Sequence, residues 1–285
     1  MIAFNISGTV RLFGTPAEEG KGGKVAMLNK DLFAGVDVCL MAHPGNINLA
    51  NARYLAMQSV HAEFSGVPAH ASAAPWEGKN ALDALVNSYV SLSTLRQQIT
   101  PTSRIHGIVT SGGVAPNVIP DATKAHYYIR TVKKKELEEL MTRVEQCFHA
   151  GALSTGCSVR IPKEPPFYDV IQNPILVQSW RDHMTVLGAT FPYATPAEEE
   201  SVSRGSTDMG NVTHAIPGFH PVFDIGCDRE IHSVEFREAA KTERAHERTL
   251  RCAAAIAAVG LQVLISGRDG ILVDIIKQWK KDTEQ

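Results

Sequence analysis

The stretch VRLFGTPAEEGKGGKVAML, residues 10–28, places a strand, a carboxylate pair, a glycine-rich turn and a helix next to one another. We predict the strand over residues 10–13 and the helix from Val25, with Glu18 and Glu19 between them. Adjacent side chains at a strand end point in different directions, so one carboxylate can bind a metal ion while the other acts on a water molecule as a general base. The glycines permit a tight turn and a close approach of the backbone to a ligand. The stretch therefore predicts an α/β protein with a polar site at this junction.

The composition is typical of an ordinary globular protein. The chain has 285 residues, 44% hydrophobic and 20% charged, which suffices for two domains or one large one. The formal net charge of −2 gives no argument for binding nucleic acid or an anionic membrane. Five widely spaced cysteines without a CxxC pair favour reduced thiols over a disulfide framework or a thiolate zinc site. With no basic start or apolar core of a signal peptide, the sequence predicts a cytoplasmic protein.

The first and last parts of the chain alternate between strand and helix patterns. The nearly continuous apolar run at residues 36–42 is typical of a strand buried on both faces. Alternation of this kind favours an α/β layer with a mostly parallel sheet. The apolar segment 252–265 is too short to span a bilayer and predicts a buried helix. The predicted elements of these parts are strands over 9–15, 36–42 and 221–226 and helices over 24–33, 174–187, 207–214 and 235–265.

The middle of the chain has a different order of elements. Its pattern reads β-α-β-β-α-β, which is the order of a ferredoxin-like sandwich. We therefore predict an α/β domain over 1–54 and 166–285, interrupted by an inserted α+β domain over 55–165. The predicted elements of the insert are strands over 55–66, 105–112, 122–132 and 157–162 and helices over 80–98 and 136–153.

Candidate metal ligands occur at three further places. His43 ends the buried strand, His232 follows a polar loop between a strand and the last helix, and Asp208 opens the helix predicted over 207–214. In open α/β sheets, ligands bind outside the carboxyl ends of the strands, where His43 and the Glu18-Glu19 pair would lie. Carboxylates and imidazoles together suit Zn²⁺, Mn²⁺ or Co²⁺. The alternatives are a structural histidine, a solvated turn and, for Asp208, a helix cap rather than a ligand.

Five motifs occur in order along the sequence and together carry a family resemblance. They are GTPAEEG with GGK (14–20 and 22–24), MAHP (41–44), GVPAHAS (66–72), SGGVAPNVIP (111–120) and STDMGNV (206–212). The chain resembles the aminoacylase and carboxypeptidase G family of co-catalytic metallopeptidases, in the amidohydrolase-like branch, and within it the dipeptidases that hydrolyse β-alanyl-lysine and Xaa-Arg peptides. That resemblance implies a catalytic α/β domain with an inserted lid and dimerisation domain.

The resemblance implies a role for each matching residue. Glu18 is similar to the general base of the family, Glu19 and His232 to ligands of one metal, and His43 to a ligand of the other. The implied reaction is hydrolysis of an amide bond in a dipeptide or an N-acyl amino acid with two divalent metals, Zn or Mn. A homodimer through the lid is also implied, because the family's lid histidine often serves the partner subunit. The lid residues that match groups holding the substrate carboxylate and the developing oxyanion are His70, Asn117 and Arg130.

The sequence departs from the family at its start. The family carries an upstream His-x-Asp strand and an acidic residue that bridges the metals, whereas residues 1–13 contain no His, Asp or Glu. We therefore expect an N-terminally truncated catalytic domain, with an exposed sheet edge that favours aggregation, and more often inactive than active as an isolated chain.

Three alternatives to a dipeptidase remain open at this point. The first is hydrolysis of another amide, such as an aminoacyl conjugate or an aminobenzoyl-glutamate compound, because these enzymes share the motifs. The second is a non-catalytic isoform or pseudo-enzyme that dimerises through the lid, without metal or turnover. The third is a solute-binding α/β protein, which leaves the Glu18-Glu19 pair without a purpose.

Overall fold

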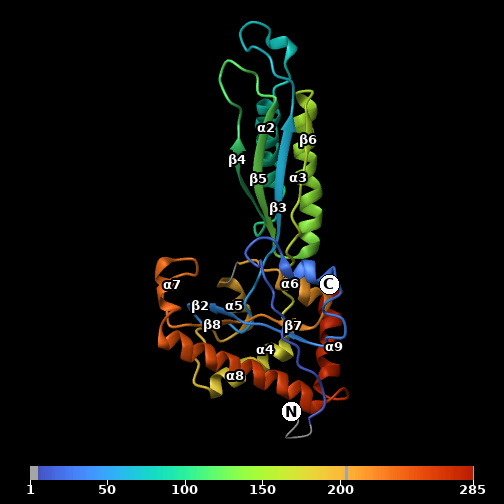
Figure 1. Cartoon of the computed structure of the whole chain (residues 1–285). Helices are drawn as coiled ribbons and strands as arrows, with labels where there is room; N and C mark the ends of the chain where they lie inside the picture. The colour runs from blue at the N-terminus through green and yellow to red at the C-terminus, as the bar shows by residue number, and fades with distance from the viewer. Residues whose placement is uncertain (1–5, 203–204, 285) are drawn as a thin grey trace. The chain divides into compact units, whose positions relative to one another are not determined.

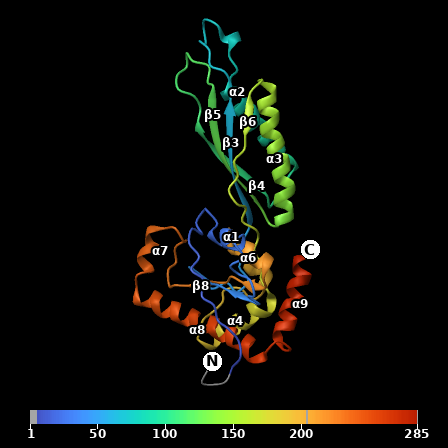
Figure 2. The same ribbon diagram turned by 45° about the vertical axis from the view of Figure 1, so that its right-hand side comes forward.

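The computed structural model describes residues 6–202 and 205–284 and divides the chain into two compact units (Figures 1 and 2). Unit 1 comprises Met1–Tyr54 and Val170–Gln285, and unit 2 comprises Leu55–Asp169. Unit 2 is thus an insertion within the sequence of unit 1, as the order of predicted elements indicates.

Unit 2 is a four-stranded antiparallel sheet with two helices on one face, and it confirms the predicted ferredoxin-like order. The strands are arranged β4-β5-β3-β6, and β3 pairs with β5 along its whole length. Helices α2 and α3 lie side by side against β3 and β5 (Figures 1 and 2). The elements are β3 (Ala56–Ser65), α2 (Ala81–Leu95), β4 (Arg104–Ser111), β5 (Ala122–Thr131), α3 (Lys134–Ser154) and β6 (Ser158–Arg160).

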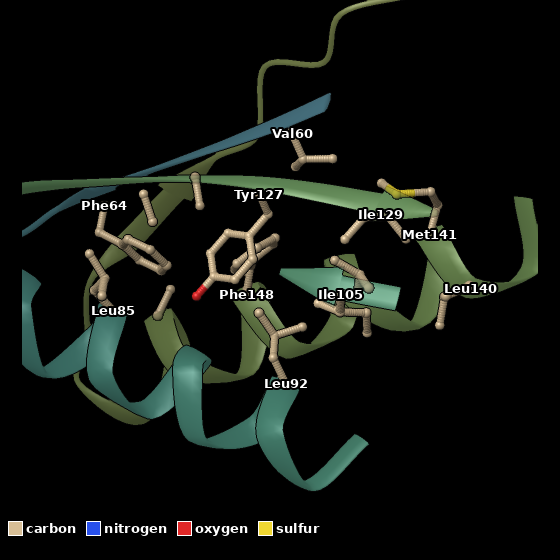
Figure 3. Close-up of a cluster of buried hydrophobic side chains, with 14 of the residues drawn as sticks. Val60, Phe64, Leu85, Leu92, Ile105, Tyr127, Ile129, Leu140, Met141 and Phe148 are labelled. Carbon is tan, nitrogen blue, oxygen red and sulfur yellow. The ribbon is translucent and has the colours of Figure 1, made fainter. Parts of the chain in front are cut away.

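The core of unit 2 lies between the sheet and the two helices. Alternate residues of β5 are buried, as expected for a strand with one covered face. In Figure 3, Phe64 and Tyr127 point from the sheet toward Leu85 on α2 and Phe148 on α3. The rings of Tyr127 and Phe148 are 5.6 Å apart between centroids, a favourable distance for an aromatic pair. These local patterns explain why the insert could be predicted almost element by element.

Unit 1 is built from short parallel strand pairs and helices. Strand β1 pairs in parallel with β7, and β2 pairs in parallel with β8. Helix α4 lies along α8 in both views (Figures 1 and 2). The elements are α1 (Gly23–Leu28), β1 (Cys39–Leu40), β2 (His43–Gly45), α4 (Pro174–Val186), α5 (Pro196–Val202), α6 (Met209–Ala215), β7 (Gly218–Phe219), β8 (Val222–Asp224), α7 (Val234–Ala239), α8 (Glu243–Ser266) and α9 (Ile271–Thr283).

The parallel pairing was predicted correctly, but the strand lengths were not. The strand predicted over 36–42 is reduced to β1, and the chain resumes pairing only at β2. Within this run only Cys39 is buried, so the prediction of a strand covered on both faces is wrong. Proline lacks an N–H group for the ladder, and the partner strands are likewise separated at His220-Pro221, where β7 ends and β8 begins.

Three helix and strand predictions at the ends of unit 1 are also wrong. Residues 9–15 form no strand, and the side chain of Leu12 is 99% exposed, so its apolar pattern has no covered face. The helix predicted over 24–33 ends at Leu28. The helix predicted over 235–265 is divided into α7 and α8 because the Thr242 hydroxyl accepts a hydrogen bond from the Ala245 N–H and starts a new helix. Helices α5 and α9 were not predicted.

By length and composition α8 could cross a membrane, and it is the one helix of the described residues that meets this criterion. A single helix of this kind is weak support for a membrane span. One stripe of α8 packs in the core of unit 1, while most of the rest of its surface is exposed. The prediction of a buried helix over 252–265 therefore holds for that stripe alone, whose buried members are Cys252, Ala255 and Val259.

Candidate active site

The Glu18-Glu19 loop is a strained turn directly before α1. Glu18 is half-buried and Glu19 is exposed. The preceding Ala17 has a φ of 60°, a conformation that is uncommon for residues other than glycine and that recurs at functional sites. Gly23 cannot be replaced without rearrangement, because a Cβ there would lie 1.8 Å from the Pro16 carbonyl oxygen. The loop thus holds Glu18 in a defined place.

A buried ion pair anchors the end of this loop. The Lys24 ammonium lies 2.7 Å from Asp208 Oδ1, and the Lys24 backbone N–H donates to Asp208 Oδ2 at 2.9 Å. Both side chains are almost entirely inaccessible to solvent. Asp208 is the N-cap residue of α6 by position, but its side chain makes no capping hydrogen bond. The interpretation of Asp208 as a helix cap is therefore wrong for the side chain, which instead joins α6 to α1.

His43 has a fixed ring orientation. Its Nδ1 lies 2.6 Å from the Pro44 carbonyl oxygen, which can only accept a hydrogen bond, so the proton is on Nδ1. In the neutral form of the ring, Nε2 then carries the lone pair. Metal-binding histidines commonly donate their second ring N–H to a carbonyl in this way.

His220 is a site residue that sequence reasoning missed. It is fully buried, and its ring stacks on that of Tyr54 at 4.6 Å and 3°. The ring of His43 lies 5.9 Å away. Neither ring nitrogen of His220 has a hydrogen-bond partner among the described residues. The signal that could have identified His220 is the His-Pro dipeptide, which occurs in β2 at 43–44 and directly before its partner strand β8 at 220–221.

The electrostatics of these side chains indicate that they share one environment. Burial lowers the pKa of His220 well below its usual range, and the nearby charges of His43 and Lys24 lower it further. Burial also raises the pKa of Tyr54, and the negative charge of Glu18 raises it further. Glu18, Tyr54, His220 and His43 are therefore linked within one end of unit 1.

His232 does not join a metal-binding group in this structure. It is exposed, with a φ of 68°, in the loop between β8 and α7. In residues 6–202 and 205–284 no three His, Cys, Asp or Glu side chains are placed to hold one ion. The donors that unit 1 does bring together are the two imidazoles of His43 and His220, which are ligand types suited to Zn²⁺ and related ions.

The lid residues fall into two places within unit 2. His70 and Asn117 lie on neighbouring segments, since His70 bridges to Val118 and the Ala71 N–H donates to the Asn117 carbonyl oxygen at 3.0 Å. Arg130 lies near the opposite end of β5, whose first residue is Ala122, and a strand rises by about 3.3 Å per residue. His70 and Arg130 of one copy are therefore far apart within unit 2.

Comparison with known proteins identifies the inserted unit first. Residues 56–155 match the peptidase dimerisation domain. The chain is 42% identical over 275 residues to the Xaa-Arg dipeptidase of Mus musculus, covering 95% of this chain and 62% of that protein. The inserted unit therefore matches the dimerisation domain of M20 peptidases, and most of the chain is similar in sequence to a dipeptidase. It spans about three fifths of the length of the mouse dipeptidase.

Two further comparisons show a more distant relative in sequence and a solved structure with a similar fold. It is 26% identical to a p-aminobenzoyl-glutamate hydrolase chain of Escherichia coli, over 97% of this chain and 68% of that protein. A dinuclear metal-binding M20 peptidase of Bacillus subtilis superposes with a TM-score of 0.61 at 18% identity, over 86% of this chain and 63% of that one. The latter likeness concerns the fold alone.

Proposed function

We propose that this protein is a metal-dependent hydrolase of amide bonds that acts on dipeptides of the Xaa-Arg or β-alanyl-lysine type. The observation that carries the proposal is the orientation of His43. Its Nδ1–H donates a hydrogen bond to the Pro44 carbonyl oxygen, which leaves the lone pair of Nε2 available to bind a metal ion. The Glu18-Glu19 loop belongs to the same end of unit 1, because Glu18 acts on Tyr54, which stacks against His220 beside His43. The sequence identity to the mouse dipeptidase supports the substrate class.

The donor chemistry fits a divalent ion. His43 would hold one ion, and Glu19 and His232 are the ligands predicted from the sequence for a second ion. When bound, a Zn²⁺ or Mn²⁺ ion polarises the scissile carbonyl and lowers the pKa of a water molecule.

We assign the proton transfer of the proposed reaction to Glu18. The side chain is half-buried on a loop fixed by Gly23 and by the Lys24–Asp208 ion pair. In the proposed reaction a Glu18 carboxylate oxygen takes a proton from the attacking water and later delivers it to the leaving amine.

The lid residues are proposed to bind the substrate. Arg130 would hold the substrate carboxylate, and His70 and Asn117 would stabilise the oxyanion with hydrogen bonds. Because His70 and Arg130 lie far apart in unit 2, we propose that His70 serves the site of the partner subunit in a homodimer.

A substrate panel with and without chelator tests the proposed reaction. We expect hydrolysis of β-alanyl-lysine and of a dipeptide ending in Arg, loss of turnover in a chelator, and recovery with Zn²⁺ or Mn²⁺. Release of the amino acid is measured by mass spectrometry, with an N-acyl amino acid and p-aminobenzoyl-glutamate in parallel. A second candidate function is hydrolysis of an aminobenzoyl-glutamate compound, which the 26% identical E. coli relative supports. A preference for p-aminobenzoyl-glutamate in this panel would favour that function. No turnover on any substrate after metal addition would contradict the proposal.

A second prediction concerns the proposed dimer. Val86, Tyr89 and Val90 are about half exposed and lie on one face of α2, and Ile108 of the edge strand β4 is 65% exposed. An exposed edge strand with apolar side chains is a surface on which a second copy can pair. We expect Ile108→Lys to shift the protein from dimer to monomer in size-exclusion chromatography with light scattering.

The matched control for the dimer is Leu153→Lys on α3. Leu153 is 83% exposed on α3 and is not one of the four residues named above, so the change adds the same charge elsewhere on unit 2 and is expected to leave association unchanged. A dimer that is equally stable in Ile108→Lys would exclude the β4 edge as the interface.

A further inference from the structure

Three buried polar atoms without partners meet around the stacked rings of unit 1. They are Nδ1 and Nε2 of His220 and the hydroxyl oxygen of Tyr54, and none has a hydrogen-bond partner among the described residues. Buried polar atoms are almost always paired, so an unpaired group in a folded protein requires an explanation, such as an ion or ligand. Three such atoms on two rings in contact indicate one common cause rather than separate packing defects.

The backbone around these rings is held by a single side-chain amide. Gln172 Oε1 accepts the His220 N–H at 2.8 Å, while Gln172 Nε2 donates to the carbonyl oxygens of His220 at 3.1 Å and Ala52 at 2.8 Å. This amide bridges the gap between β7 and β8 and fixes His220 relative to the segment that carries Tyr54. A ring positioned by such contacts is preorganised for a ligand.

His43 completes the arrangement from the neighbouring strand. Its ring centroid is 5.9 Å from that of His220, at an interplanar angle of 56°. Since the Nδ1 proton of His43 is engaged by Pro44, the free nitrogen of His43 is Nε2. The nearby positive charge of Lys24 is balanced by Asp208 at 2.7 Å, which reduces its repulsion of a cation.

We propose that His220 is a second imidazole ligand, beside His43, of a divalent transition-metal ion in unit 1. Imidazole nitrogens are preferred ligands of Zn²⁺ and related transition-metal ions. The ion would bind a ring nitrogen of His220 that otherwise has no hydrogen-bond partner among the described residues. The remaining coordination positions are open to carboxylates, water and substrate. This inference rests on the metal dependence of the proposed function and adds a ligand that the sequence motifs do not contain.

The test uses the full chain and Zn²⁺ alone. The variant His220→Phe keeps an aromatic ring against Tyr54 and removes both nitrogens. We expect it to weaken the Kd for Zn²⁺ in equilibrium dialysis by on the order of 10–100-fold or more, while thermal stability without metal is kept or raised because two unpaired polar atoms are removed. The control His246→Phe changes an exposed histidine of α8 and should leave the Kd unchanged.

Nuclear magnetic resonance of ¹⁵N-histidine-labelled protein separates a ligand from a structural residue. A ligand role requires a ring nitrogen of His220 to shift on addition of Zn²⁺, together with Nε2 of His43. Zn²⁺ binding that shifts His43 alone, or a folded His220→Phe variant with the wild-type Kd, would overturn the proposal. If both rings shift but no dipeptide is hydrolysed, the metal ligand stands and the proposed reaction fails.

Discussion

Replacing Glu18 by Gln is expected to lower kcat/KM for the proposed dipeptide hydrolysis by on the order of 10²–10⁴-fold. The substitution keeps the size and hydrogen-bonding shape of the side chain but removes its ability to take a proton. Because the proton is transferred in the transition state, kcat should decrease with little change in KM. Zn²⁺ content, measured by elemental analysis, should stay at the wild-type level, since Glu18 is not one of the predicted ligands.

Glu18 is better suited than Glu19 to this test because its position in the structure is more closely defined. Ala17, with its φ of 60°, turns the chain directly before Glu18, and the Glu18 charge acts on the buried hydroxyl of Tyr54. Glu19 is exposed, and a loss in Glu19→Gln should be recovered partly by added metal because Glu19 is a predicted ligand.

The control for charge alone is Glu247→Gln, an exposed position on α8 where activity should not change. Activity of Glu18→Gln within about threefold of wild type, far short of the loss expected for a general base, would mean that another group takes the proton.

The inserted unit could be predicted from the sequence because its pattern is local. Strand β5 has one covered face, so its apolar residues alternate, and helix α3 presents one apolar stripe. Residues 122–132 predicted a strand and β5 spans Ala122–Thr131, while 136–153 predicted a helix and α3 spans Lys134–Ser154. The order of the elements then sets the topology.

The strands of unit 1 could be predicted less well because their limits depend on distant partners. An apolar run such as residues 36–42 indicates burial but not where pairing stops. Pairing in β1 and β2 is determined by β7 and β8, which lie far along the sequence and are themselves separated at His220-Pro221. The strand predicted over 9–15 has no covered face, as the exposure of Leu12 makes plain.

The candidate site divides in the same way. Glu18 and Glu19 and the glycines after them form a local motif, and their loop could be located from the sequence. His220 could not, because a histidine in an apolar stretch of sequence is most often a packed core residue. His220 becomes a candidate ligand only through its stacking with Tyr54 and its proximity to His43, and both contacts depend on the fold.

Removing the ammonium of Lys24 is expected to destabilise unit 1 strongly. In Lys24→Met the fully buried Asp208 carboxylate loses the cation that lies 2.7 Å away, while the backbone N–H of residue 24 stays in place. Breaking a buried ion pair from one side typically costs about 3–5 kcal/mol, because the remaining charge is neither solvated nor balanced. The same change should loosen the Glu18 loop, since the pair joins the start of α1 to α6.

Tryptophan fluorescence during guanidinium unfolding measures the loss of stability in unit 1. Trp180 is fully buried in unit 1, and Trp279 of the same unit donates to the Thr213 carbonyl oxygen, whereas Trp76 of unit 2 is 78% exposed and should change little on unfolding. The control is Lys24→Met combined with Asp208→Asn, which removes the orphaned charge and should restore most of the lost stability, because a neutral amide is far less costly to bury than an unpaired carboxylate. A loss below about 1 kcal/mol in the single variant, as found for exposed pairs, would mean that Asp208 is hydrated and that the pair does not fix the loop.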